Sequence, residues 1–181
     1  MQALAALVPI AWWWHCYREL QAPPRSLLAI AACIGIGLLV FALWIAPMPG
    51  WAHLGERAAS FEPVQADGAL RWDLIAVRLF GAVLVVPLME ELFWRSFLMR
   101  WIDRRRFLDL PPGATSAVAV LSACAVFALA HDLWLAGFIA GVIYALIYRR
   151  LANLWYAVIA HATTNLALGA WVVYCRAWEY W

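Results

Sequence analysis

The chain has 181 residues, of which 67% are hydrophobic and 13% are charged, and its mean hydropathy is +0.78. Because a soluble domain of average composition is about 45–50% apolar and about 25% charged, this composition indicates an integral membrane protein and excludes an ordinary soluble enzyme. The net charge of +2 is too small to predict a nucleic-acid partner, and the length predicts one integral-membrane domain over residues 1–181.

The first part of the chain predicts two membrane helices and a long loop. Residues 1–14 form a short apolar run, and we expect a membrane helix here rather than a cleaved signal peptide, because a basic region and a clear cleavage site are missing. Residues 26–52 carry no charge and predict the clearest span, since about 20 residues cross the hydrocarbon core. Pro47 and Pro49 are expected to end that helix. The glycines, prolines and charges of residues 50–73 predict the longest loop.

The rest of the chain predicts four more spans, so the expected fold is all-α: a polytopic bundle of about six transmembrane helices around a polar intramembrane cavity. An arginine-rich segment at residues 100–107 and a Pro-Pro-Gly break at 111–113 separate the first of these spans from the second. Arg149 and Arg150 are expected to stop the third. The four spans are predicted at residues 74–99, 113–130, 133–148 and 151–175.

The arginines indicate how these spans are oriented, because cytoplasmic loops of membrane proteins carry an excess of basic residues. Eight arginines lie near the span ends on one side of the predicted bundle, and three lie on the other. We therefore expect the side with eight to face the cytoplasm. Its arginines are Arg18, Arg25, Arg100, Arg104, Arg105, Arg106, Arg149 and Arg150.

Three charged side chains interrupt the third predicted span, in the sequence L-M-E-E-L-F-W-R-S-F at residues 88–97. Glu91 and Arg95 are four residues apart, so they share a helix face and can form an ion pair. Glu90 lies about 100° away around the helix and is left without that partner. Because a desolvated carboxylate without a partner is costly, we interpret Glu90 as a residue with a chemical role, such as general acid–base catalysis.

Two more polar pairs lie in or beside predicted spans. The sequence F-A-L-A-H places Phe127 and His131 four residues apart, and H-A-T-T-N does the same for His161 and Asn165. Taken alone, His131 fits an interfacial histidine, while His161 and Asn165 fit hydrogen bonding between helices without any function. Together with Glu90 they are explained most simply by one shared site, because ionisable residues within a membrane are usually functional.

Counting along the helices tests whether these groups can meet. Glu90 lies ten residues before Arg100, and His161 lies eleven after Arg150. At 1.5 Å per residue, both lie about 15–17 Å from the basic end. The same count places His131 about 27 Å from that end along a straight helix, so a tilt or an inward loop is needed to bring it to the others.

The motifs E-E-x-x-x-R, F-x-x-x-H and H-x-x-x-N, in this order, resemble the signature of the CPBP intramembrane glutamic proteases, which are similar to the type II CAAX prenyl endopeptidases. The resemblance covers about residues 74–170. The segment E-E-L-F-W-R-S-F-L-M-R-W and the ending W-E-Y-W further resemble a bacterial branch associated with exosortase and PEP-CTERM sorting systems. The resemblance implies a multi-pass protein of the bacterial cytoplasmic (inner) membrane, a membrane-associated protein or peptide substrate, and an exosortase-type sorting system as a partner.

The resemblance also implies a role for each site residue, with no cofactor and no metal. Glu90 and His131 would activate a water molecule for attack on the scissile carbonyl. His161 and Asn165 would form an oxyanion hole, whose donors stabilise the negative charge that develops during the attack. The supporting residues would be Glu91 and Arg95.

Two alternatives to an intramembrane endopeptidase stay open. One is a zinc-dependent membrane hydrolase, because Glu90, His131 and His161 could supply the three ligands of a catalytic zinc, although the H-E-x-x-H motif is missing. The other is a non-catalytic membrane scaffold or an immunity-type partner of a sorting system, against which the unpaired Glu90 argues. The four cysteines lack C-x-x-C spacing and predict neither a disulfide framework nor a metal site.

Overall fold

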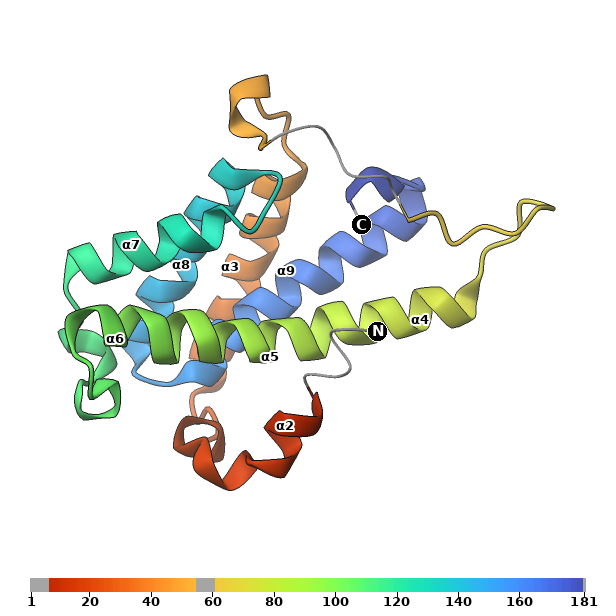
Figure 1. Ribbon diagram of the computed structural model, residues 1–181. Coiled ribbons are helices and arrows are strands. Elements are labelled where there is room, and N and C mark those ends of the chain that lie inside the picture. Colours follow the sequence, from red (N-terminus) through yellow and green to blue (C-terminus); the bar gives the residue numbers. More distant parts are fainter. Residues whose placement is uncertain (1–6, 55–60, 181) are drawn as a thin grey trace.

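The computed structural model describes residues 7–54 and 61–180, and within these ranges the fold is helical (Figure 1). Their β-structure is limited to one isolated bridge, between Val64 and Leu70. The predicted all-α fold is therefore confirmed. In chain order the α-helices are α2 (Leu7–Trp12), α3 (Leu27–Ile45), α4 (Trp72–Phe80), α5 (Val86–Glu91), α6 (Met99–Asp103), α7 (Ala117–Ala128), α8 (Trp134–Leu151) and α9 (Leu154–Cys175).

Four helices in the described part of the chain are long and apolar enough to cross a membrane. They are α3, α8, α9 and a continuous helix of 32 residues, Trp72–Asp103, in which α4, α5 and α6 follow one another. Two π-helical segments, Gly81–Val85 and Leu92–Leu98, join these three. The protein is thus a multi-pass membrane protein, and its third predicted helix extends beyond both expected ends.

The helix ends follow local chemistry, with one difference from the prediction. The Ser26 side chain accepts a hydrogen bond from the Ala29 N–H at the start of α3, and α3 ends before Pro47 as predicted. The prediction that Arg149 and Arg150 stop α8 was wrong, because basic residues in the last turn of a helix are compatible with the helix dipole. The helix ends instead where Ala152 adopts a left-handed conformation, with φ of 49°.

The helix α7 is too short to span the membrane, unlike the predicted span at residues 113–130. Its 12 residues measure about 18 Å, against about 30 Å for the hydrocarbon core. Asp103, at the end of the long helix, holds the start of α7. Its carboxylate accepts hydrogen bonds from the Ser116 N–H at 2.6 Å and from the Ser116 hydroxyl at 2.7 Å. A helix that starts at the basic end therefore finishes part of the way across.

The described N-terminal residues also differ from the predicted first span. The helix α2 has only six residues, and 3₁₀ turns follow it, while residues 1–6 lie outside the described part. Glu19 accepts hydrogen bonds from the hydroxyls of Ser96 and Tyr148, and it pairs with Arg100 at 3.3 Å. These polar contacts hold the segment against the basic end of the bundle, so its described residues do not cross it.

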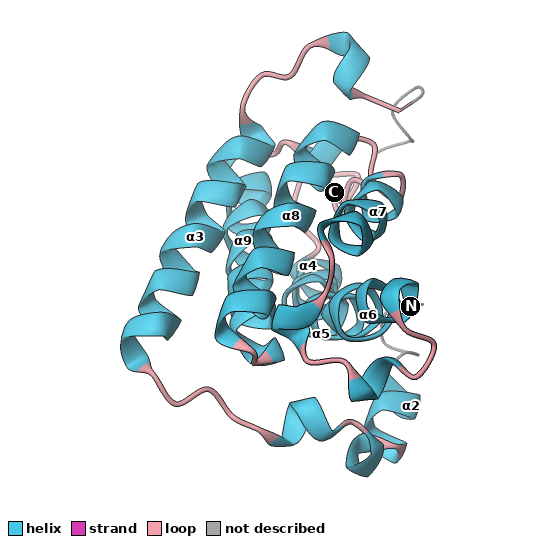
Figure 2. Cartoon of the chain, turned by 90° about the vertical axis from the view of Figure 1, so that its left-hand side faces the viewer, coloured by secondary structure: helices cyan, strands magenta, loops and turns pink. Residues whose placement is uncertain are grey.

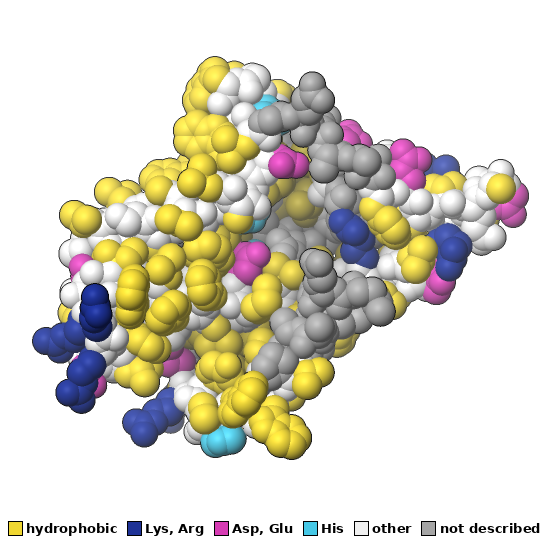
Figure 3. All heavy atoms as spheres, in the orientation of Figure 1, with side chains coloured by type: hydrophobic (Ala, Val, Ile, Leu, Met, Phe, Trp, Pro, Cys, Tyr) yellow, Lys and Arg dark blue, Asp and Glu magenta, His cyan; other side chains and the backbone are white. Residues whose placement is uncertain are grey.

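The helix α9 lies at the centre of the bundle and contacts α3, α8 and the long helix (Figure 2). Its contact with α3 is close because Gly37 has no side chain. A Cβ atom at Gly37 would lie 2.4 Å from the Ala160 carbonyl oxygen, so any other residue would push the two backbones apart. Small residues at such crossings are typical of membrane helices. In Figure 3, hydrophobic side chains cover much of the visible face over the long helix and α7, as expected for contact with lipid.

Candidate active site

A small cavity inside the bundle brings the predicted site residues together. It has a volume of about 110 Å³, and Glu90, His131, His161 and Asn165 all line it. These residues come from α5, from the turn after α7, and from two successive turns of α9. The remaining walls are formed by Trp44, Val86, Phe127, Ala140, Tyr144, Thr164 and Leu168.

The predicted pairing of Glu91 with Arg95 is confirmed. Arg95 Nε lies 3.1 Å from Glu91 Oε2, and both side chains are almost completely buried. This contact is an ion pair whose angle falls outside hydrogen-bond geometry, and Arg95 also donates a hydrogen bond from Nη2 to the Gly141 carbonyl at 3.3 Å. The Phe127 ring lies 4.5 Å from the guanidinium carbon and adds a cation–π contact. Glu91 is therefore held beside the cavity by a neutralising partner.

His161 lies between the two adjacent glutamates. Its Nδ1 is 2.9 Å from Glu91 Oε1, and its Nε2 is 4.0 Å from Glu90 Oε2. An ionised carboxylate can only accept a hydrogen bond, so the pairing of Glu91 with Arg95 requires that His161 Nδ1 carries a proton. The ring of Tyr144 stacks on the imidazole, with centroids 4.9 Å apart and an interplanar angle of 17°. The predicted meeting of Glu90 and His161 at one depth is thus confirmed, and the tautomer of His161 follows from Glu91.

Glu90 and Glu91 are adjacent in sequence but have different surroundings. The Glu91 side chain has no exposed area, whereas that of Glu90 is 21% exposed and faces the cavity. Among the described residues, Glu90 Oε2 has no hydrogen-bond partner. The carboxylate that the spacing left unpaired is therefore also the one that can meet a water molecule or a substrate in the cavity.

His131 reaches the cavity because of the short α7. It lies three residues beyond the end of that helix, in the turn before α8. Because α7 ends part of the way across the bundle, this turn lies at the depth of the cavity, as an inward loop would. Its Nδ1 lies 2.9 Å from the Phe127 carbonyl oxygen, which is an acceptor. Nδ1 therefore carries the proton, and Nε2 keeps the lone pair that can accept one. The rings of Phe127 and Trp44 contact the imidazole, with centroids 4.5 and 5.5 Å away.

Asn165 lies one turn after His161 on α9 and also lines the cavity. Its side-chain Nδ2 donates a hydrogen bond to the Ala82 carbonyl oxygen at 2.7 Å, in the first π-helical segment. An amide nitrogen carries two protons, so one N–H is used by Ala82 and the second remains for a group in the cavity.

Sequence reasoning missed three residues that shape the site. Trp44 on α3 and Tyr144 on α8 contact the two histidines. The Tyr144 hydroxyl donates to Thr164 Oγ1 at 2.8 Å, and Thr164 donates to the Gly37 carbonyl at 2.8 Å. One signal was present in the sequence: Tyr144 lies inside an apolar run, away from the span ends where aromatic residues usually anchor a helix, whereas Trp44 lies at the end of α3 and gives no such signal.

The zinc alternative can be compared with the arrangement of the possible ligands. Within residues 7–54 and 61–180, no three His, Cys, Asp or Glu side chains are arranged as ligands of one metal ion. Glu90, His131 and His161 share the cavity, and the contacts of His161 Nδ1 with Glu91 and of His131 Nδ1 with the Phe127 carbonyl leave both Nε2 atoms at the cavity, so the zinc hydrolase stays an alternative.

Comparison with known proteins identifies the family. The model of the type II CAAX prenyl endopeptidase Rce1-like family matches residues 72–167, which is more than half of the chain. The match runs from α4 into α9 and includes Glu90, His131, His161 and Asn165. No curated protein and no solved structure matches the chain significantly. The chain therefore belongs to the type II CAAX prenyl endopeptidase Rce1-like family, a family of membrane proteases.

Proposed function

We propose that this protein is a glutamic intramembrane endopeptidase that hydrolyses a peptide bond of a membrane-associated protein or peptide. In this proposal Glu90 and His131 activate a water molecule, and His161 and Asn165 bind the oxyanion. The observation that carries the proposal is that these four residues, from three separate parts of the chain, line one cavity of about 110 Å³. A cavity of this size suits a water molecule and the reacting peptide group rather than a large ligand.

Charge balance supports a definite protonation state for the site. Glu91 and Arg95 neutralise each other, which leaves Glu90 and His161 Nε2 as neighbours at 4.0 Å. If Glu90 is ionised and His161 is neutral, the cluster holds an uncompensated negative charge, which is costly in a cavity with mostly apolar walls. One proton that exchanges between Glu90 and His161 Nε2 removes that cost. We therefore propose that these two groups share one proton.

The shared proton connects the two halves of the proposed mechanism. When it lies on His161, the imidazole donates from Nε2 and can stabilise an oxyanion, while the ionised Glu90 can accept a proton from water. His131 Nε2 is the second base at the cavity, since its Nδ1 is held by the Phe127 carbonyl. Asn165 supplies the second oxyanion donor through its remaining N–H. Glu91 and Arg95 act as supporting residues that fix the tautomer of His161.

The arginine distribution and the family resemblance support a location and a substrate. We propose that the protein lies in the bacterial cytoplasmic membrane with its arginine-rich end toward the cytoplasm. The resemblance to the exosortase-associated branch makes a membrane-anchored sorting signal the substrate to test first. Exosortase genes beside the gene for this protein would support such a partner, and their absence from every genome that encodes close relatives would argue against it.

The proposed function is tested by comparing peptide ends in cells. Glu90→Gln and His131→Ala are expected to lower cleavage of the natural substrate by about 10²–10⁴-fold while the protein stays inserted in the membrane. Quantitative mass spectrometry of new peptide ends in membranes measures this loss. Glu179→Gln, at an exposed position of the C-terminal turn, is the matched carboxylate control and should cleave normally. If both site variants process every substrate as the wild type does, the protease proposal is wrong and a scaffold role is favoured.

A further inference from the structure

The long helix that carries Glu90 contains a backbone irregularity next to the cavity. The segment Gly81–Val85 is π-helical, a conformation defined by hydrogen bonds from an N–H to the carbonyl five residues before it. The Val86 N–H accordingly donates to the Gly81 carbonyl, not to the Ala82 carbonyl that an α-helix would use. Such π segments are rare in helices and occur often at functional sites.

Pro87 leaves the Ala82 carbonyl without a donor from its own helix. In the α-helical pattern its donor would be Val86, which is already used by Gly81. In the π-helical pattern its donor would be residue 87, but proline has no N–H. A carbonyl inside a membrane protein that lacks a hydrogen bond costs free energy, so another group has to supply the donor.

Asn165 supplies that donor from α9. Its Nδ2 lies 2.7 Å from the Ala82 oxygen, a short distance for a bond between neutral groups. Because a carbonyl can only accept, the contact determines which end of the Asn165 amide faces the long helix. It also pins α9 to the long helix at a second point, beside the contact of His161 with Glu91 one turn earlier.

We propose that Pro87 is a positioning residue of the site and acts through the Ala82 carbonyl on Asn165. By removing the helix's own donor, Pro87 reserves this carbonyl for Asn165, whose amide is then held in one orientation with its second N–H available to the cavity. This inference rests on the proposed function for the role of Asn165 as an oxyanion donor, but the hydrogen bond itself can be tested without any catalytic assay.

Selective isotope labelling gives a direct test, because the chain contains only two asparagines, Asn153 and Asn165. In the ¹⁵N-asparagine-labelled full-length protein in lipid nanodiscs, NMR should show two side-chain amide groups. Asn165 should have one proton shifted strongly downfield and slow to exchange with water. Asn153, which donates to the Ala22 carbonyl at 2.9 Å, is an internal control. The variant Asn153→Gln identifies which signals belong to Asn165.

Pro87→Ala restores an N–H that competes for the Ala82 carbonyl. We expect the shifted Asn165 proton to move and to exchange faster, while the Asn153 signals stay in place. Leu88→Ala, on the same turn, retains its N–H and is the matched control that should leave both signals unchanged. If the Asn165 signals in Pro87→Ala equal those of the wild type, the inference is overturned. If Pro87→Ala does not fold, the wild-type spectrum still decides, because two equivalent, fast-exchanging Asn165 protons would also overturn it.

Kinetics then test the link to catalysis. Pro87→Ala should lower kcat by up to about 10²-fold and change KM little, since an oxyanion donor acts in the transition state. In an Asn165→Ala background, Pro87→Ala should have less than about a twofold further effect, because both changes remove the same donor. If the loss of kcat in the double variant equals the product of the losses in the two single variants, the positioning role is overturned. If Pro87→Ala loses the NMR signature but the wild type has no measurable protease activity, only the proposed function is contradicted.

Discussion

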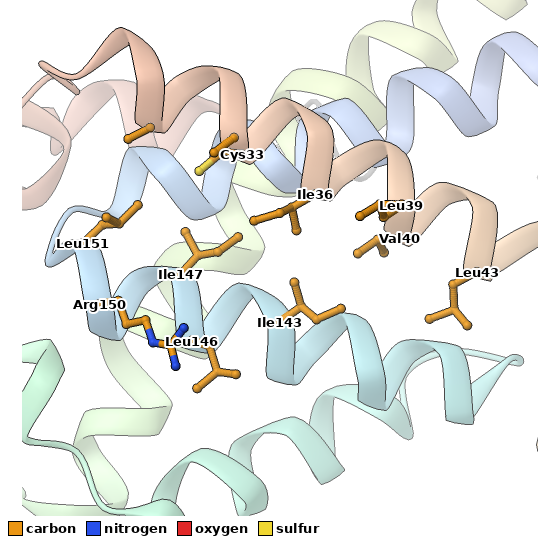
Figure 4. A pocket seen from close by; sticks show the side chains of 12 residues that line it. Cys33, Ile36, Leu39, Val40, Leu43, Ile143, Leu146, Ile147, Arg150 and Leu151 are labelled. Atoms are coloured by element: carbon orange, nitrogen blue, oxygen red, sulfur yellow. The ribbon is translucent and has the colours of Figure 1, made fainter.

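Two hollows on α3 and α8 differ in size and chemistry. The larger is a groove of about 510 Å³ between these helices, lined by apolar side chains and by Arg150 at one end (Figure 4). The smaller is the cavity of about 110 Å³ that contains the two histidines. Neighbouring residues separate them: Leu43 lines the groove and Trp44 the cavity, while Ile143 lines the groove and Tyr144 the cavity.

The comparison shows that volume is a poor guide to function in this molecule. The groove lies between two helices that can cross a membrane, so apolar walls are what contact with lipid requires there. In the cavity His131, His161 and Asn165 are held by hydrogen bonds, because an unpaired polar group in an apolar environment is costly, and Glu90 is the polar residue left for chemistry. The hydrogen bonds and ion pairs of the cavity, rather than its size, therefore distinguish it, and the following substitutions compare the two hollows.

The largest difference is expected between the two arginines. Arg95→Leu leaves Glu91 buried without its ion-pair partner and should lower the free energy of unfolding by about 3–5 kcal/mol. Arg150→Leu, at the exposed end of the groove, should change it by less than about 0.5 kcal/mol. Reversible unfolding in mixed detergent micelles measures both values. Similar losses for the two variants would contradict the distinction between cavity and groove.

A smaller difference is expected between the neighbours Tyr144 and Ile143. Tyr144→Leu removes the ring that stacks on His161 and the hydroxyl that donates to Thr164, so cleavage should fall about 2- to 10-fold. Ile143→Leu keeps the volume of the groove wall and should leave cleavage unchanged. Initial cleavage rates in proteoliposomes, at equal amounts of inserted protein, provide the comparison. Equal rates for the two variants would show that the stack on His161 does not matter.

The smallest effect is expected when the groove is filled. Leu146→Trp adds a large side chain to the groove wall at a partly exposed position, and cleavage should change by less than about twofold. The same cleavage assay tests this expectation. A strong loss of cleavage with unchanged stability would show that the groove takes part in substrate binding, and the separation of the two hollows would then be wrong.

The sequence was most informative where charges interrupt apolar helices. The four-residue spacing predicted the ion pair of Glu91 with Arg95, and counting along the helices predicted that Glu90 and His161 meet. Both inferences use only the rise and the repeat of a helix, which hold closely enough even though the segment after Glu91 is π-helical. The polar side chains also grouped His131 with this site, although counting along a straight helix could not explain its depth.

The remaining features depend on contacts that distant residues make. The end of α8 depends on the left-handed backbone of Ala152, and the start of the short α7 depends on Asp103. The position of the N-terminal segment depends on Glu19. These features appear only in the folded chain. The π-helical segment beside Pro87 was not predicted either, because regular periodicity was assumed throughout the span. These are tertiary effects that local sequence patterns do not specify.

Glu90 and His161 are proposed to share one proton at the cavity, with His161 Nδ1 protonated toward Glu91. Nitrogen-15 NMR of the four histidines in the labelled protein tests this claim most directly, with His161→Gln to assign the signal. We expect a protonated Nδ1 in the wild type and an Nε2 signal between its protonated and unprotonated positions, and in Glu90→Gln the Nε2 signal should move to the unprotonated position while Nδ1 stays protonated. An unprotonated Nδ1 in the wild type, or an Nε2 signal that does not respond to Glu90→Gln, would contradict it.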